Sequence, residues 1–172
     1  MRNKTNNTIY WAAFEHGDCR IHIAATADGI CFVGSENQSF NELVTWSNSR
    51  FPGSVLVQDD NRLLPYSIEL LEYLQGTRKS FTIPFDYYGT PFQMDVWNAL
   101  CSIPYGQTYC YSDIANQIQK PAAVRAVGTA IGANPLLIVV PCHRVIGKNG
   151  ALTGYRGGIA MKKKLLQLEQ AE

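Results

Sequence analysis

Hydrophobic and polar residues alternate with a short period in the first part of the chain, which is the pattern of β-strands. Three runs of this kind cover residues 9–14, 19–25 and 30–33. Glycine-containing polar segments at 16–18 and 27–29 separate them, and the second is a hairpin-type turn signal. The pattern therefore predicts a small antiparallel sheet.

The pattern then changes to helical spacing. Residues 41–49 and 63–74 are predicted to form helices, the second with leucine and isoleucine recurring on one face and Gly76 at its end. Strands with covering helices predict an α+β fold. An extended stretch at 80–88 follows, and we place the domain boundary there, giving domains at 1–86 and 87–172.

Helical spacing dominates the second domain. Thr90 and Pro91 form an N-cap and first-turn signal, and the residues after them place an apolar face along one side of a helix. Three further helices are predicted, at 112–119, 122–132 and 159–170. The first two of these are short and are separated by a tight break, so they are a candidate helix-turn-helix.

The helix predicted at 122–132 carries one long side chain, Arg125, among small residues such as Ala123 and Ala126. One interpretation is a packed helix whose arginine reaches solvent. The other is a small-residue face pressed into a groove and carrying one long wedge. That geometry suits the narrow minor groove of DNA better than the reading of base edges in the major groove.

Charge is distributed unevenly along the 172 residues, although the net charge is only +1. Residues 1–90 contain seven Lys/Arg against ten Asp/Glu, and residues 91–172 contain eight against four. A basic second half indicates an anionic partner such as nucleic acid, with a solvated basic surface as the alternative. No apolar run approaches the length of a membrane span. The five scattered cysteines argue against a disulfide framework and for a reducing compartment, so we expect a cytoplasmic protein.

A cysteine and a histidine follow the apolar run at 136–140, which is predicted to be a buried strand. Pro141 should end strand pairing, so Cys142 and His143 are predicted to lie on a turn. A thiol is nucleophilic as its thiolate, which neighbouring imidazole and cationic groups favour. By itself the Cys-His pair is weak evidence, because free cysteines are mostly small buried hydrophobes.

Several motifs then stand in one order: Tyr109-Cys-Tyr-Ser-Asp-Ile-Ala, Arg125-Ala-Val-Gly, Ala133-Asn-Pro, Pro141-Cys-His-Arg-Val-Ile-Gly, Gly154-Tyr-Arg-Gly-Gly and Lys164-Leu-Leu-Gln-Leu-Glu. Together they resemble the O6-alkylguanine–DNA alkyltransferase family, the methylated-DNA–protein-cysteine methyltransferases, in its bacterial form. The resemblance is strong over residues 87–172, and the first half matches only in size and element order. It implies a ribonuclease H-like first domain and a second domain with a winged-helix-like helix-turn-helix.

The resemblance implies a single-turnover repair protein, which flips an alkylated guanine out of duplex DNA and moves the alkyl group irreversibly to its own cysteine. Cys142 is then the nucleophile and His143 its base, acting through a water, with Glu169 orienting the histidine. Tyr111 would donate to the guanine ring as the base leaves and would crowd the DNA backbone. Without the resemblance, Glu169 would be read as a solvated charge at a helix end.

The same resemblance assigns the DNA-binding face and the substrate pocket. Arg125 would fill the gap left by the flipped base, with Ala123 and Ala126 on the face that meets the groove. The pocket would be formed by the hinge residue Asn134, the backbone carbonyl groups of Cys142 and Val145, the ring of Tyr155 and the backbone of Arg156. Arg144 would have a structural role.

The resemblance implies no cofactor and no small-molecule methyl donor, because the alkyl group comes from DNA. The expected partner is double-stranded DNA, bound through the minor groove by a monomer, with no membrane involved. Some family members hold zinc in the first domain. Here His16, Cys19, His22 and Cys31 are too loosely spaced for such a site, so we expect no metal.

Three other functions can be compared with this interpretation. A cysteine hydrolase or acyltransferase would need an oxyanion hole, for which the sequence gives no signal. A helix-turn-helix regulator would need polar side chains on its recognition helix, where this chain has alanine and valine. A non-catalytic protein that binds alkylated DNA would lack the reactive cysteine, whereas Cys142 is present.

Overall fold

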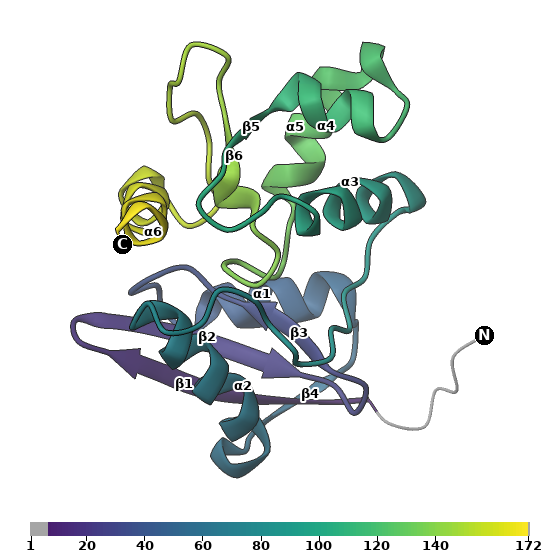
Figure 1. Cartoon of the computed structure of the whole chain (residues 1–172). Coiled ribbons are helices and arrows are strands. Elements are labelled where there is room, and N and C mark those ends of the chain that lie inside the picture. The colour runs from purple at the N-terminus through teal and green to yellow at the C-terminus, as the bar shows by residue number, and fades with distance from the viewer. Residues whose placement is uncertain (1–6, 172) are drawn as a thin grey trace. The chain divides into compact units, whose positions relative to one another are not determined.

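The computed structural model describes residues 7–171 of the chain, which divides into two compact units between Tyr88 and Gly89 (Figure 1). The sequence placed the boundary after residue 86. Within the described residues, none of the helices has the length and apolar character needed to cross a bilayer.

The first unit contains a four-stranded sheet in the order β3-β2-β1-β4. The predicted strands are confirmed as β1 (Thr8–His16), β2 (Cys19–Ala25) and β3 (Ile30–Val33), which pair antiparallel. The expectation of a purely antiparallel sheet was wrong, because β4 (Val55–Gln58) pairs parallel with β1. A parallel neighbour needs a crossover connection, and helix α1 (Asn41–Arg50) supplies it between β3 and β4.

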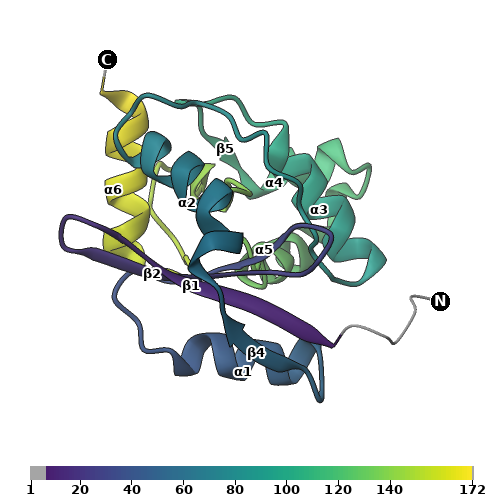
Figure 2. The ribbon, with the colours of Figure 1, turned by 90° about the horizontal axis from the view of Figure 1, so that it is seen from below.

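Two helices cover this sheet, and Figure 2 shows α1 and α2 (Asp60–Leu74) on opposite faces of it. Helix α2 begins earlier than the predicted residue 63, because the Asp59 side chain caps it by accepting from the Arg62 backbone N–H at 3.0 Å. One buried cluster lies between the sheet and α1 and contains Ile9, Ala24, Cys31, Phe32 and Leu43. Alternating strand residues therefore reach a core on each face of the sheet.

The predicted extended stretch closes the first unit. Phe85 forms an isolated bridge with Ile30 at the start of β3. Asp86 is buried and accepts hydrogen bonds from the hydroxyl groups of Thr26 and, at 2.8 Å, Tyr88. This segment is therefore part of the first unit's core structure.

The second unit is mainly helical, as predicted. Helix α3 (Pro91–Cys101) starts with a capping box between Thr90 and Gln93. Its other elements are β5 (Tyr109–Cys110), α4 (Tyr111–Gln117), a 3₁₀-helix at Pro121–Ala123, α5 (Val124–Gly132), a 3₁₀-helix at Cys142–Arg144, β6 (Val145–Ile146) and α6 (Ile159–Gln170). The predicted helix 122–132 is thus divided, since its first residues form the 3₁₀-helix that follows Lys120. Strands β5 and β6 pair parallel and were not predicted.

The apolar run Leu136–Val140 was wrongly predicted to be a strand. It forms consecutive turns, with Val139 N–H donating to the Leu137 carbonyl at 2.8 Å and Val140 N–H to the Leu136 carbonyl at 3.0 Å. Ile138 adopts a φ of 71°, a conformation that β-branched residues rarely occupy. All five side chains are buried, and a short apolar run indicates burial without fixing the backbone conformation.

Candidate active site

Cys142 opens the 3₁₀-helix that follows Pro141, so the predicted turn is confirmed. Its residue is only 2% exposed. The backbone N–H of Cys142 donates to the Val140 carbonyl at 2.8 Å, and its sulfur accepts from the Asn134 side-chain amide at 3.1 Å. The sulfur is therefore held in a fixed position by the turn behind it.

Asn134 organises this turn. Its buried Nδ2 donates to the carbonyl groups of Leu136 at 3.3 Å and Val140 at 3.1 Å as well as to the sulfur, and its Oδ1 accepts from Leu136 N–H at 2.9 Å. These bonds replace those that a strand partner would supply to the run at 136–140. The hinge role expected for Asn134 thus has a physical basis in this turn.

His143 and Glu169 meet in the interior, from the 3₁₀-helix and from α6. The His143 Nε2 and Glu169 Oε1 atoms lie 2.8 Å apart, and both side chains are buried. A carboxylate accepts only, so Nε2 carries the proton and donates to Glu169, which leaves Nδ1 as the basic nitrogen. The sequence therefore placed this pair correctly, although Glu169 alone resembled a surface charge.

Arg144 completes the buried ionic cluster. Its guanidinium donates to both Glu169 carboxylate oxygens at 2.8 to 3.1 Å and to the Ile103 carbonyl at 2.7 Å. The Gly106 backbone N–H also donates to this carboxylate, at 3.3 Å. Arg144 supplies the counter-charge without which a buried carboxylate would be costly, in line with the expected structural role.

The protonation states of the site follow from burial. Burial raises the pKa of the Cys142 thiol, with the Asn134 hydrogen bond and the charges of Arg156 and Lys162 opposing the rise. Burial also lowers the pKa of His143, against the effect of Glu169. At neutral pH the pair consists of a thiol and a neutral imidazole, which is the combination needed for proton transfer from sulfur to nitrogen.

A pocket of about 250 Å³ opens beside the thiol. It is lined by Tyr111, Gly128, Ile131, Gly132, Cys142, Gly154, Tyr155 and Arg156. The structure thus brings together four of the residues predicted to surround a substrate. The Tyr111 hydroxyl donates to the Thr153 carbonyl at 2.7 Å, so its ring is anchored to the loop that precedes α6.

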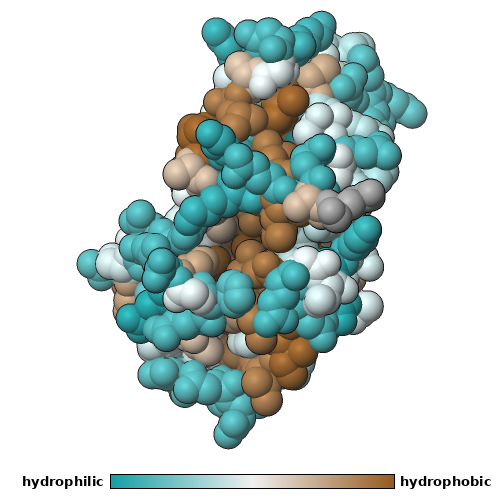
Figure 3. Space-filling model, turned by 60° about the vertical axis from the view of Figure 1, so that its left-hand side comes forward, coloured by the Kyte–Doolittle hydropathy of each residue, from teal (hydrophilic) through white to brown (hydrophobic). Residues whose placement is uncertain are grey.

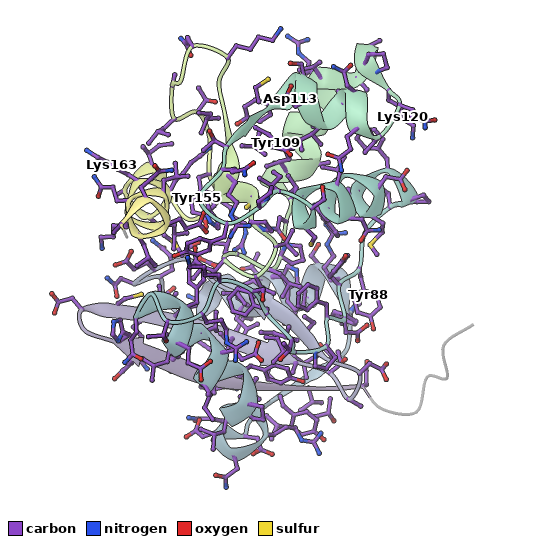
Figure 4. The ribbon with its side chains drawn as sticks, in the orientation of Figure 1. Tyr88, Tyr109, Asp113, Lys120, Tyr155 and Lys163 are labelled. Carbon is purple, nitrogen blue, oxygen red and sulfur yellow. The ribbon has the colours of Figure 1, made fainter. Side chains whose placement is uncertain are left out.

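Lys162 was missed by the sequence analysis. Its buried ammonium group donates to the carbonyl groups of Val145 at 2.6 Å, Thr153 at 3.2 Å and Gly154 at 3.3 Å. The Val145 carbonyl, expected to bind substrate, is therefore already one acceptor of this lysine. A signal was present, because Lys162, Leu165 and Glu169 share one face of α6 with the spacing of buried positions. Figure 4 shows the neighbouring Lys163 pointing away from α6, while Tyr155 lies on its inner side.

Of the predicted DNA-binding residues, Tyr111 lines the pocket, and the other three lie at or just before the start of α5. Arg125 and Ala126 are exposed at the start of α5, and Ala123 is half-buried in the 3₁₀-helix before it. The opposite side of α5 is buried and is tied to α3 by the Trp97 indole N–H, which donates to the Ala130 carbonyl at 2.8 Å. A fixed helix thus presents small residues and one arginine outward.

Some large hydrophobic side chains are exposed at the surface, and one of them lies at the start of α5. In the view of Figure 3, apolar patches stand among hydrophilic side chains. The exposed large hydrophobic residues include Val55, Val57, Leu64, Ile68, Val124 and Ile159. Val124 lies directly before Arg125, so the exposed start of α5 is partly apolar as well as basic.

The residues considered for zinc are dispersed over the sheet. His16 and Cys19 pair across the β1–β2 turn, whereas His22 lies against the rings of Trp11 and Phe40. Burial raises the pKa of Cys31, which disfavours the thiolate that zinc requires. Within residues 7–171 no group of three histidine, cysteine or acidic side chains is arranged to hold a metal ion.

Comparisons with known proteins agree with this geometry in both units. Residues 9–87 match the ribonuclease-like domain of 6-O-methylguanine DNA methyltransferase, and residues 91–171 match the DNA-binding domain of the same family. An inducible methylated-DNA–protein-cysteine methyltransferase of Bacillus subtilis is 63% identical over 163 residues, covering 95% of this chain and 91% of the relative. One from Methanosarcina acetivorans is 42% identical, covering 94% of this chain and 98% of the relative.

Solved structures show the same similarity. An O6-methylguanine methyltransferase of Mycobacterium tuberculosis superposes with a TM-score of 0.81 at 36% identity, covering 94% of this chain and 93% of that one. A structure of Mycobacterium tuberculosis OGT in complex with DNA gives a TM-score of 0.80 at 36% identity, covering 95% of this chain and 92% of that one. The α+β fold with a ribonuclease-like first domain and a helical DNA-binding second domain is therefore confirmed.

Proposed function

The chain belongs to the methylated-DNA–protein-cysteine methyltransferase family, and we propose that Cys142 is the cysteine to which it transfers the methyl group. The protein is an O6-methylguanine DNA methyltransferase: it binds DNA and repairs the damaged base directly by moving the methyl group to a cysteine. One observation carries the assignment to Cys142. It is the cysteine that lies in the wall of the pocket, beside a buried histidine–glutamate pair.

The transfer balances without a cofactor. The Cys142 thiol gives its proton to Nδ1 of His143, directly or through a water, and Glu169 stabilises the resulting imidazolium. The sulfur attacks the methyl carbon, the bond from carbon to O6 breaks, and its electron pair goes to the guanine. The guanine then takes up a proton at its ring nitrogen and His143 releases the one it accepted, so that the protons balance. The product is a thioether at Cys142, so each protein molecule acts once.

Tyr111 is positioned to assist the leaving base. Guanine departs with a developing negative charge, and a hydroxyl that donates to its ring nitrogen stabilises that charge. The Tyr111 hydroxyl lies at the pocket and already donates a hydrogen bond to Thr153. In the complex, it would exchange this acceptor for the base, which would be bounded by the ring of Tyr155 and by backbone groups of Val145 and Arg156.

The exposed start of α5 supports binding in the minor groove. Small residues at Ala123 and Ala126 allow close approach, and Arg125 extends from the same surface. A base that leaves the stack costs a few kcal/mol, and a side chain that fills the gap offsets part of this cost. We infer that Arg125 fills the gap.

The remaining assignments follow from this mechanism. We propose that residues 1–86 form a structural domain and that 87–172 bind DNA and transfer the alkyl group, because every candidate site residue lies in the second unit. A monomer suffices, since the pocket is complete within one chain. A cytoplasmic location fits five free thiols and a DNA substrate. The regulator and lesion-binder alternatives leave the buried Cys142–His143–Glu169 arrangement without a function. A hydrolase would use it but would also need an oxyanion hole, for which the sequence gives no signal.

The test is the stoichiometry of repair. The protein is mixed with an excess of duplex DNA containing O6-methylguanine, and the remaining lesion is quantified over time. We expect one lesion to be removed per protein molecule, and none with Cys142→Ser. Cys101→Ser, which changes an exposed thiol, should behave as the wild type. Continued turnover beyond one lesion per protein, or full repair by Cys142→Ser, would contradict the proposal.

A further inference from the structure

Arg156 joins two segments of the active site. It lies in the loop between β6 and α6, where Gly154 and Gly158 adopt φ values of 58° and 90°. Its Nε donates to the Asn134 carbonyl at 2.9 Å and its Nη2 to the Pro135 carbonyl at 3.2 Å. The side chain therefore reaches back from the pocket loop to the hinge at the end of α5.

The contact is significant because Asn134 has two functions. Its backbone carbonyl accepts from Arg156, and its side-chain amide donates to the Cys142 sulfur at 3.1 Å. On the basis of the function proposed above, we propose that Arg156 is a positioning residue. It holds Asn134 in place relative to the loop that receives the base, and Asn134 in turn holds the Cys142 sulfur.

The fork of an arginine suits this contact. Two consecutive carbonyl groups accept from two nitrogens of one planar group, which fixes the direction of both bonds. A lysine could bring the same charge but only one flexible ammonium group, and a small residue could bring neither. The charge and the geometry of Arg156 can therefore be separated by substitution.

The positive charge of Arg156 also stabilises the thiolate form of Cys142. The groups that surround Cys142 are Lys162 from α6, Arg156 from the pocket loop, Tyr111 from α4, and Asn134 and His143 from the chain on either side of it. Arg144, which is buried, is paired with Glu169. Arg156 and Lys162 both favour the charged form of Cys142, against the effect of its burial.

The experiment compares full-length wild type, Arg156→Gln and Arg156→Lys, with Arg20→Gln as the matched control, because Arg20 is an exposed arginine of the first unit that pairs with Glu15. Single-turnover transfer from O6-methylguanine duplex DNA gives the rate at saturating DNA and the half-saturating concentration separately. The apparent pKa of Cys142 is read from the ultraviolet absorbance of its thiolate, with the signal of the matching Cys142→Ser form subtracted.

Loss of a charge-assisted hydrogen-bond pair predicts that Arg156→Gln lowers the saturating rate about tenfold to a hundredfold, with an unchanged half-saturating concentration. The apparent pKa of Cys142 should rise in this variant. Arg156→Lys should restore that pKa while recovering only part of the rate, and Arg20→Gln should match the wild type.

Several results would overturn the inference. One is an Arg156→Gln variant with the wild-type rate and thiolate titration. Another is a change confined to the half-saturating concentration, which would make Arg156 a DNA contact. A third is a rate loss that follows the unfolded fraction, measured by thermal melting, while the Cys142 titration is unchanged. If instead the wild type fails to methylate Cys142, the proposed function fails and not this inference alone.

Discussion

At the scale of single residues, the site without substrate contains a neutral thiol, Cys142, and a neutral imidazole, His143. Burial favours the uncharged forms of both Cys142 and His143, and in the proposed mechanism the ion pair forms only as the proton moves from the thiol to the imidazole. Asn134, Glu169 and the nearby cations stabilise that ion pair from fixed positions. Such preorganised polar groups lower the barrier because they need not reorient during the reaction.

The pH dependence of transfer follows from His143. Burial lowers its pKa from the ordinary 6.5, so the imidazole stays neutral, and able to accept the proton, below pH 6.5. We expect the saturating transfer rate to remain level from pH 7.5 down to about 6.5 and to fall only at lower pH. Single-turnover rates in constant ionic strength check this, and a midpoint of the fall above 6.5 would contradict the buried neutral histidine.

Glu169→Gln should reduce both activity and stability. It leaves the Arg144 guanidinium buried without a counter-charge, which costs about 3–5 kcal/mol of unfolding free energy, and it slows transfer at least about tenfold. Denaturant unfolding and single-turnover rates measure the two effects. Glu72→Gln is the matched control, because it breaks the partly exposed pair with Arg78 and should cost only about 0–1 kcal/mol. Equal losses in both variants would refute the buried pair's special role.

The proposed catalytic residues could be located from their sequence motif, whereas the contacts of Lys162 and Arg156 could not. Cys142, His143 and Glu169 were placed by a resemblance that fixes their order along the chain. The contacts of Lys162 and Arg156 are made to backbone carbonyl groups, which every residue possesses and no motif records. Their role depends on how loops meet in space, so it emerges only from the structure.

At the scale of elements, prediction succeeded where the pattern and the end signals agreed. Strands β2 and β3 and helix α6 have the predicted bounds, and α3 begins at the predicted cap. Strand β4 was missed because it lies at the sheet edge, where Val55 is 59% exposed and little hydrophobic pattern remains. The turns at 136–140 were missed because Asn134, not a neighbouring strand, satisfies part of their backbone.

Helix α5 makes a prediction about duplex DNA. Arg125→Ala removes the side chain proposed to fill the stack, so base extrusion should become less favourable. We expect transfer from O6-methylguanine in duplex DNA to slow about tenfold or more, and transfer from single-stranded DNA to change little. Lys163→Ala, which removes an exposed charge from α6, is the control. Equal slowing on both substrates would show that Arg125 contributes only charge.

At the scale of the whole molecule, the two units differ in net charge and in the candidate site residues that they hold, which indicates different functions. The first is acidic in net charge and holds none of the candidate site residues, and the second is basic and holds all of them. Arg144 and Lys162 of the second unit are buried and Arg156 is half-buried, so they are committed to the site. Its exposed cations are Lys120, Arg125, Lys148, Lys163 and Lys164.

The salt dependence of DNA binding tests this division. Each neutralised phosphate contributes about 0.9 to the slope of log affinity against log salt. Five exposed cations therefore predict a slope no steeper than about −4.5. Fluorescence anisotropy with the Cys142→Ser form, which binds without reacting, measures it. A markedly steeper slope would show that basic residues of the first unit also contact phosphates.

The identity of the alkylated residue tests the central claim most directly. The full-length protein is treated with one equivalent of duplex DNA containing O6-methylguanine, digested, and analysed by peptide mass spectrometry. We predict one added methylene mass, located on Cys142, with Cys19, Cys31, Cys101 and Cys110 unmodified. The added mass on another cysteine, or an unmodified protein after the lesion has disappeared, would contradict the account.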